Sequence, residues 1–180
     1  MKNLANILTI TRLLVLPFIV VLFYIPDSWA AWSCLGLYII GAVTDFFDGW
    51  VARKFNQVSE FGRFLDPISD KIFVLTIMIM LVAAGLVNGP WVILILLILM
   101  REFLVAGIRE FLGPKNVTVH VTNLAKWKTA SQMLALGFLI VAEQVDYVWE
   151  AGIGFLAIAT LLTLITGGQY LRAAIPHMKG

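Results

Sequence analysis

The sequence predicts an all-α membrane protein, a polytopic bundle of six transmembrane helices with both termini in the cytoplasm. Of its 180 residues, 61% are hydrophobic and only 13% are charged, whereas soluble domains have about 45–50% apolar and about 25% charged residues. Long uncharged stretches recur along the chain, and none shows the sustained alternation of a barrel strand. Among the linkers, only alternate ones carry Lys and Arg, which is typical of membrane proteins.

The composition also excludes several classes of protein. The high apolar content rules out a water-soluble globule and a disordered chain. The formal net charge of +2 is too small to attract a polyanion, so we expect no nucleic-acid partner. The single cysteine, Cys34, excludes an internal disulfide and a cysteine-based zinc site. The length is that of one domain, residues 1–180.

Uncharged stretches predict the individual helices in chain order. Leu13–Pro26 and Ser28–Thr44 each predict one span. Ile72–Met100 is too long for one crossing of a hydrocarbon core about 30 Å thick, and the Asn-Gly-Pro turn signal within it predicts two spans joined by a tight hairpin. Thr129–Ala142 and Ala151–Leu171 predict the last two spans. With ends extended past these limits, the expected spans are 7–26, 30–50, 67–87, 91–112, 125–143 and 150–172.

The distribution of charge orients this bundle. Lys and Arg occur in the N-terminal segment, in the linkers after the second and fourth spans and in the C-terminal segment. The linkers on the opposite side carry only acidic residues, namely Asp27, Glu143, Asp146 and Glu150. Because short cytoplasmic loops are enriched in Lys and Arg, both termini are predicted to be cytoplasmic, which agrees with an even number of spans.

Four aspartates gather at the cytoplasmic ends of the second and third spans. Asp45 and Asp48 are three residues apart, and Asp66 and Asp70 are four apart, so each pair shares a helix face. The linker between these spans is short and basic, so the spans are expected to be antiparallel neighbours whose carboxylates converge. Four such groups would repel one another unless some are protonated or a cation lies between them. Oxygen ligands suit Mg²⁺ or Mn²⁺, and these ions suit a diphosphate substrate.

Three other residues of this segment fit the same chemistry. Gly49 and Gly62 allow a backbone or a ligand to approach closely, and Arg53 could reach the same phosphates. The alternative is a charged face at the membrane interface, in which the carboxylates pair with nearby Lys and Arg side chains.

The segment from Asp45 to Asp70 also carries a family resemblance. Its pattern Asp45-x2-Asp48-Gly49-x2-Ala52-Arg53-x8-Gly62-x3-Asp66-x3-Asp70 is similar at every defined position to the signature of the CDP-alcohol phosphatidyltransferases. The resemblance implies a six-helix membrane enzyme, usually dimeric, with a site open to the cytoplasm. It further implies that the aspartates bind one or two divalent ions, that Asp70 is also the general base, and that the CDP moiety is bound by Asp48, Gly49, Ala52, Arg53 and Gly62.

A cluster of basic residues forms a second candidate site. Arg101 lies near the middle of the fourth span, where an ionisable residue is costly and indicates a function. Arg109 lies on the same helix face, and Lys126 and Lys128 begin the fifth span. Together they would bind an anion, most simply the phosphate of a phosphorylated alcohol. Alternatively, the arginines pair with neighbouring acidic residues to stabilise the bundle, and the lysines extend to lipid headgroups.

Thr9 and Arg12 are further candidates for the phosphate site. With Asn6 they recur at three-residue spacing on the first helix, so they could face the same cavity. The alternative is that they cap this helix and anchor it at the membrane interface.

Other strings resemble the branch of the same family that makes phosphatidylglycerol phosphate. They are NILTITRLLVLPF, VTDFFDGWVARKFNQ, REFLVAGIREF and KWKTASQM, and the likeness covers almost the whole chain. It implies transfer of a phosphatidyl group from CDP-diacylglycerol to sn-glycerol 3-phosphate, with release of CMP, at a bacterial-type inner membrane. The expected partners are these two substrates, membrane lipids and a second copy of the chain.

Three other functions remain open on the sequence. The same chemistry could use another acceptor, such as phosphatidylglycerol or inositol phosphate, and would differ only in the acceptor pocket. An aspartate-rich membrane prenyltransferase also binds diphosphate through metal, but leaves Gly49, Ala52 and Arg53 without a role. A small cation transporter would use the carboxylates as ion ligands, but this function would leave the cluster of basic residues unexplained.

Overall fold

The computed structural model describes residues 4–55, 60–113 and 123–178, and within them the side chains of 10–44, 65, 68–113 and 124–177. The described residues form six α-helices and one short 3-10 helix, with no strand. The elements are α1 (Leu4–Leu22), α2 (Ser28–Phe55), α3 (Glu60–Ala83), η1 (Gly89–Trp91), α4 (Val92–Leu112), α5 (Asn123–Ile140) and α6 (Val148–Met178). The all-helical prediction is therefore confirmed for the part of the chain that the structure describes.

Each predicted span corresponds to one helix, but several helices extend beyond their predicted ends on the side of the aspartates; α6, predicted to end at residue 172, continues to Met178. α2 was expected to end near residue 50 and continues to Phe55, and α3 was expected from residue 67 and begins at Glu60. The predicted ends lie only a few residues past the uncharged stretches, but a helix does not have to end where its surroundings change from lipid to water. The defined positions of the family signature consequently lie on helical backbone.

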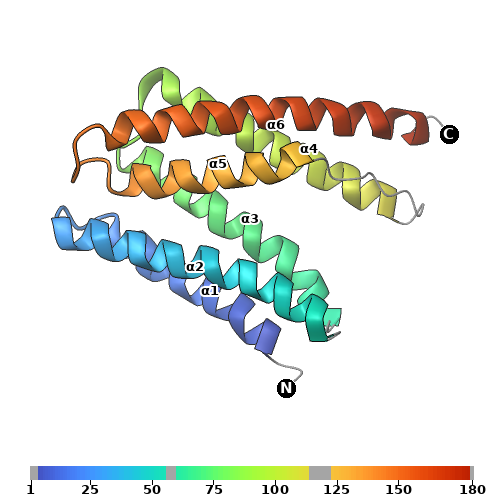
Figure 1. Cartoon of the computed structure of the whole chain (residues 1–180), viewed down its shortest axis with the longest axis horizontal. Coiled ribbons are helices and arrows are strands. Elements are labelled where there is room, and N and C mark those ends of the chain that lie inside the picture. Colours follow the sequence, from blue (N-terminus) through green and yellow to red (C-terminus); the bar gives the residue numbers. More distant parts are fainter. Residues whose placement is uncertain (1–3, 56–59, 114–122, 179–180) are drawn as a thin grey trace.

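The helices are arranged so that one end of the bundle holds three connections. Figure 1 shows the α1–α2, α3–α4 and α5–α6 connections at one end, and the start of α1 and the end of α6 at the other. α6 packs along α4 and α5, while α1 packs along α2 and α3. α2 and α3 run in opposite directions, as the short linker between them predicts.

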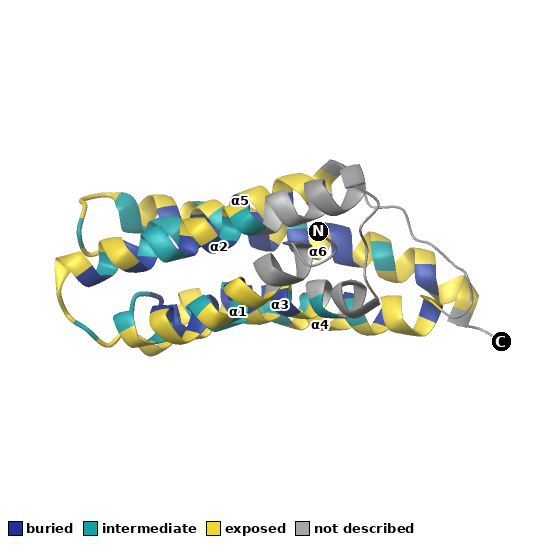
Figure 2. Ribbon diagram, turned by 90° about the horizontal axis from the view of Figure 1, so that it is seen from below, coloured by how far each residue is buried: buried dark blue, intermediate teal, exposed yellow. Residues whose placement is uncertain are grey.

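The bundle has an apolar core and an apolar exterior. The core includes Ile77 and Leu81 of α3, Ile98 of α4 and Leu136 of α5, all fully buried. Large apolar side chains also cover the outer faces of the helices, where Figure 2 shows long rows of exposed residues. A surface of this kind is unfavourable in water and is suited to lipid.

Length and composition single out two of the described helices as able to cross a membrane, Gly89–Leu112 and Val148–His177. Ile10–Leu22 and Ser28–Thr44 are shorter apolar stretches. That all six helices span the membrane stays a prediction.

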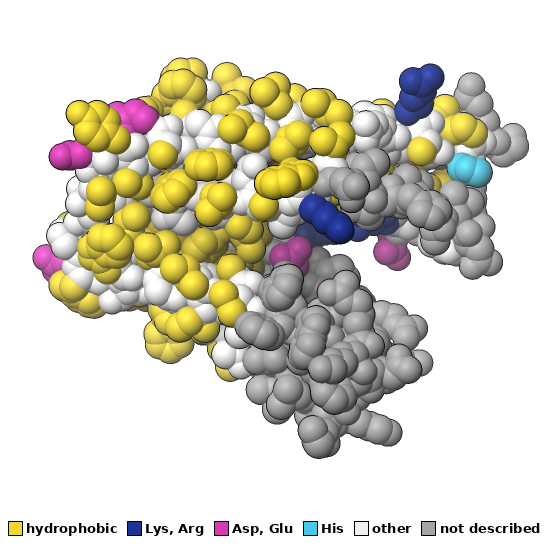
Figure 3. All heavy atoms as spheres, viewed as in Figure 1, with side chains coloured by type: hydrophobic (Ala, Val, Ile, Leu, Met, Phe, Trp, Pro, Cys, Tyr) yellow, Lys and Arg dark blue, Asp and Glu magenta, His cyan; other side chains and the backbone are white. Residues whose placement is uncertain are grey.

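Charge separates along the long axis of the bundle. On the face in Figure 3, the charged side chains at the end with the three connections are acidic, whereas Lys and Arg lie toward the other end beside further acidic side chains, and apolar side chains cover the surface between the two ends. The acidic residues described at the connections are Asp27, Glu143 and Asp146, with Glu150 in the first turn of α6. The asymmetry predicted from the sequence is thus present in the folded chain.

Candidate active site

The junction of α2 and α3 positions the predicted metal ligands. A Cβ added to Gly41 would lie 2.5 Å from Cζ of Phe73, so only glycine fits at this contact. The Tyr38 ring stacks on the same phenyl ring, with centroids 5.7 Å apart. Gly41 lies one helical turn before Asp45, and Phe73 lies three residues after Asp70. The close contact therefore joins the two helices next to the segment that carries all four aspartates.

Helical backbone holds the signature residues in the expected register. Asp45 and Asp48 lie on α2, and Asp66 and Asp70 lie on α3, so each pair shares a helix face. Of the four carboxylates, only that of Asp70 belongs to the described side chains, and it is exposed. The predicted CDP ligands, which are Asp48, Gly49, Ala52, Arg53 and Gly62, also lie on helical backbone and outside the described side chains. Their predicted roles stay predictions.

A cavity of about 140 Å³ lies between α3, α4 and α5 next to Asp70. At about 30 Å³ per water, it holds on the order of five waters or one small polar molecule. Its polar lining comes from all three helices and consists of Asp70, Lys71, Glu102, Lys128, Thr129 and Gln132. The residue predicted to be the general base and one of the predicted phosphate ligands therefore line one cavity.

Glu102 is the centre of the polar contacts at this cavity. Its Oε1 accepts a hydrogen bond from Nη1 of Arg101 at 3.0 Å and another from Nζ of Lys128. The Lys128 side chain is only 8% exposed, and that of Arg101 is 12% exposed. Because a buried ammonium is costly without a counter-ion, Glu102 stabilises the charge of Lys128.

α6 contributes further contacts to Arg101. Nη2 of Arg101 donates to Oγ1 of Thr166 at 2.9 Å. Gly167 lies directly under the Arg101 side chain, because a Cβ at this position would lie 2.8 Å from Cγ of Arg101. Thr166 and Gly167 are both buried within the chain. At these positions the small residues of α6 contact α4 of the same chain.

Three other predicted phosphate ligands do not line this cavity. Nε of Arg109 donates to the Tyr170 hydroxyl at 3.0 Å, and its guanidinium lies 5.1 Å from the centre of that ring. Lys126 is exposed, and Arg12 is buried on α1. None of these three is among the residues that line the cavity. The side chain of Thr9 lies outside those described.

Several residues of the site were not among the predicted ones. Glu102 had a signal in the sequence, since it is an acidic residue beside Arg101 in an apolar span. Gln132 lines the cavity, and its Oε1 is buried without a hydrogen-bond partner in the described structure. Thr166 and Gly167 had no distinguishing signal, because small residues are common throughout membrane helices.

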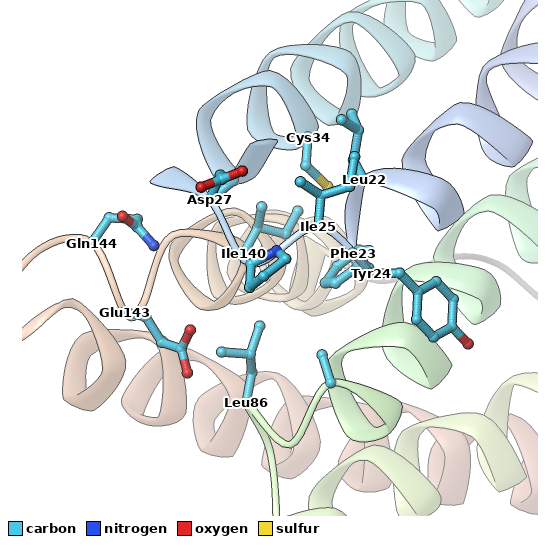
Figure 4. Close-up of a pocket in the computed structure, with 13 residues that line it drawn as sticks. Leu22, Phe23, Tyr24, Ile25, Asp27, Cys34, Leu86, Ile140, Glu143 and Gln144 are labelled. Carbon is cyan, nitrogen blue, oxygen red and sulfur yellow. The ribbon is translucent and has the colours of Figure 1, made fainter. Parts of the chain in front are cut away.

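A larger cavity of about 280 Å³ lies at the opposite end of the bundle. Figure 4 shows it between the α1–α2 connection, Leu86 and the end of α5, with the carboxylates of Asp27 and Glu143 at one side. No Lys or Arg lines it. Because a phosphorylated substrate needs cations, size alone does not make this cavity the active site.

Comparison with known proteins decides the family. The model of the CDP-alcohol phosphatidyltransferase family matches residues 2–166. The chain belongs to this family. Curated relatives named CDP-diacylglycerol–glycerol-3-phosphate 3-phosphatidyltransferase include one from Rickettsia typhi, 47% identical over 96% of this chain and 97% of the relative. Those from Cereibacter sphaeroides (38% identical, 98% and 97% covered) and Escherichia coli K12 (36%, 96% and 94%) have the same name.

Proposed function

We propose that this protein transfers a phosphatidyl group from CDP-diacylglycerol to sn-glycerol 3-phosphate, forming phosphatidylglycerol phosphate and CMP. The family match and the names of relatives that align over almost the whole chain support this reaction. The observation that carries it in this chain is the cavity shared by Asp70 and Lys128. The family match argues against a prenyltransferase or a cation transporter.

The described residues suit two parts of the reaction. The acceptor hydroxyl attacks the phosphorus attached to diacylglycerol, the bond from phosphorus to the CMP oxygen breaks, and CMP leaves. Asp70 takes the proton of the attacking hydroxyl as general base. Lys128 binds the phosphate of the acceptor through a charge-assisted hydrogen bond. Asp70 of α3 and Lys128 of α5 line the same small cavity from different helices, which suits an acceptor with a hydroxyl at one end and a phosphate at the other.

Asp45, Asp48, Asp66 and Asp70 would hold one or two divalent ions, Mg²⁺ or Mn²⁺. The fit rests on the helix register of the two pairs and on the Gly41–Phe73 contact, which joins α2 and α3 beside them. Carboxylate oxygens are the ligands that these ions prefer. A bound ion would neutralise the charge on the diphosphate and on the departing CMP. Asp48, Gly49, Ala52, Arg53 and Gly62 would bind the CDP moiety.

The proposal includes an orientation in the membrane. The end of the bundle that holds the start of α1, the end of α6 and most Lys and Arg would face the cytoplasm, in agreement with the positive-inside rule. All six helices would span a bacterial-type inner membrane, and the Asp70 cavity would open to the cytoplasm. A homodimer is expected from the family resemblance alone, since the α6 residues Thr166 and Gly167 are buried within one chain.

One assay tests the reaction directly. Purified protein is incubated with CDP-diacylglycerol, Mg²⁺ and labelled sn-glycerol 3-phosphate, and the lipid formed is identified by thin-layer chromatography while CMP is measured separately. We expect labelled phosphatidylglycerol phosphate and an equal amount of CMP. A panel of other alcohols, including inositol phosphate and phosphatidylglycerol, tests the acceptor. Turnover of another alcohol without turnover of glycerol 3-phosphate would replace the proposed acceptor and keep the chemistry.

Removal of divalent ions tests the metal. Dialysis against EDTA is expected to abolish product formation, and addition of Mg²⁺ or Mn²⁺ is expected to restore it. Full activity in the presence of the chelator would contradict the proposed role of the four aspartates.

A further inference from the structure

We propose that Thr166 and Gly167 of α6 are positioning residues for the acceptor phosphate, and that they act through Arg101 and Glu102 on Lys128. The inference rests on the proposed function, because it assumes that Lys128 binds the phosphate of the acceptor. It assigns a role to a helix that contributes no residue to the cavity lining.

The contacts form one continuous series across three helices, here called the Thr166–Lys128 series (Thr166, Arg101, Glu102 and Lys128). Oγ1 of Thr166 on α6 accepts from Nη2 of Arg101 on α4 at 2.9 Å. Nη1 of the same guanidinium donates to Oε1 of Glu102 at 3.0 Å. That oxygen also accepts from Nζ of Lys128 on α5. The series ends at the cavity, which Glu102 and Lys128 line together with Asp70.

Arg101 occupies an internal place in this series. Its two terminal nitrogens each donate to another residue of the protein, its side chain is only 12% exposed, and it does not line the cavity. A guanidinium fixed on both sides holds its partners in one geometry. Arg101 therefore acts on the acceptor site through Glu102, whereas Lys128 keeps further ammonium hydrogens available for a ligand, since an ammonium has three donors.

The charges of the Thr166–Lys128 series explain the role of Arg101. The buried ammonium of Lys128 requires a counter-ion. Glu102 supplies one, but its carboxylate lines the cavity and would repel an incoming phosphate. Arg101 offsets the charge of Glu102, so the three groups together keep one net positive charge beside the cavity. Any change that moves Arg101 would leave Lys128 and Glu102 as a neutral pair, which attracts a phosphate less strongly.

Gly167 makes the position of Arg101 possible. An added Cβ would lie 2.8 Å from Cγ and 3.3 Å from Nε of Arg101. The Cγ atom is close to the helix backbone and has little freedom to move, so the arginine side chain would have to leave its present position. Nothing lies within 4 Å of a Cβ added to the neighbouring Gly168.

This pair of glycines gives a matched experiment. Gly167→Ala and Gly168→Ala make the same chemical change at adjacent positions of one helix, and both gain the helix propensity of alanine. We expect Gly167→Ala to raise the KM for glycerol 3-phosphate at least fivefold, while the KM for CDP-diacylglycerol and kcat change less than twofold. Gly168→Ala is expected to leave all three constants unchanged. Equal effects of the two variants on the acceptor KM would overturn the proposal.

The hydroxyl of Thr166 gives a second test by a different change. Thr166→Val removes the hydroxyl and is expected to raise the acceptor KM about three- to tenfold, and Thr166→Ser, which keeps the hydroxyl, is expected to restore it. Thr160→Val is the control, because the Thr160 hydroxyl on the same helix bonds, among the described residues, to backbone oxygens of Leu94 and Leu156. A normal acceptor KM in Thr166→Val would overturn the proposal, as would a failure of serine to restore it.

Glu102→Gln distinguishes positioning from simple competition. If Glu102 holds Lys128 in place, the variant raises the acceptor KM. If the carboxylate only competes with the phosphate for Arg101 and Lys128, removal of its charge lowers that KM, and the proposal is wrong. Wild-type protein that makes no lipid from glycerol 3-phosphate would refute the proposed function itself. Normal wild-type turnover with unaffected Gly167→Ala and Thr166→Val variants would refute only the positioning role.

Discussion

Gly41 of α2 and Phe73 of α3 are in such close contact that a single added carbon on Gly41 would lie 2.5 Å from the Phe73 ring. The contact lies one helical turn from Asp45 and three residues from Asp70. It limits how closely α2 and α3 can approach each other beside the predicted metal ligands. Position 41 therefore requires glycine for packing, although this residue takes no part in the chemistry.

The first prediction concerns this contact. We expect Gly41→Ala to lower the free energy of unfolding by about 1–3 kcal/mol, as overpacking of a tight core does, and to lower activity by moving α2 away from α3. Gly36→Ala on the same helix is the control, since a Cβ there meets nothing within 4 Å. Thermal unfolding in detergent and the lipid assay measure both effects. Partial recovery in the Gly41→Ala/Phe73→Leu double variant would identify the ring as the cause, and no recovery would contradict this explanation.

The second prediction concerns the base. Asp70→Asn is expected to lower kcat by about 100-fold or more, because it removes a proton acceptor that contributes about 10²–10⁴-fold in comparable enzymes. Asp27→Asn, an exposed aspartate at the opposite end of the bundle, is the matched control and should retain the wild-type rate. Both rates are measured with saturating substrates and Mg²⁺. If Asp70→Asn retains its rate, another group takes the proton.

The third prediction concerns the phosphate ligand. Lys128→Gln keeps a donor for Glu102 and removes the positive charge, so we expect kcat/KM for glycerol 3-phosphate to fall about tenfold or more. A hydrogen bond with a charged partner contributes about 1.5–3 kcal/mol, and about 1.4 kcal/mol is a factor of ten. Arg172→Gln, at an exposed position near the end of α6, controls for the loss of one positive charge. An equal loss in both variants would point to the overall charge of this end of the protein.

The fourth prediction separates the remaining basic residues from Lys128. Arg109 is engaged by Tyr170, and Lys126 is exposed away from the cavity. Arg109→Gln and Lys126→Gln are therefore each expected to change the acceptor KM less than Lys128→Gln does. Kinetic constants for the three variants, measured in the same detergent, decide the order. A larger effect at Arg109 or Lys126 would place the phosphate elsewhere.

The fifth prediction concerns orientation. Cys34 is the only cysteine and is buried, so a Cys34→Ala background allows single cysteines to be introduced at exposed positions. In cells whose outer membrane has been made permeable and whose inner membrane is intact, a membrane-impermeant maleimide is expected to label the introduced cysteine of the Glu150→Cys variant. Arg172→Cys should react only after the inner membrane is opened. The reverse pattern would place both termini outside the cytoplasm.

The sequence predicted the helices well because their signal is local. An uncharged run of sufficient length indicates a helix wherever it occurs, and the Asn-Gly-Pro turn correctly divided the long run between α3 and α4. The ends of α2 and α3 were predicted less well, because the change from apolar to charged residues marks a change of surroundings rather than the end of a helix.

The features of the site also fall into two kinds, those that sequence patterns predict and those that depend on helix packing. Sequence patterns were sufficient to predict the family, the helical placement of the four aspartates and the charge asymmetry between the two ends, since all three depend on residue types at fixed spacings. The packing of the helices was needed to show that Lys128 lines a cavity with Asp70 while Arg109 lies against Tyr170. It alone joined Thr166 to Arg101, 65 residues apart. The physical reason is that spacing along one helix fixes which side chains share its face, whereas the partner across the interface depends on how separate helices pack.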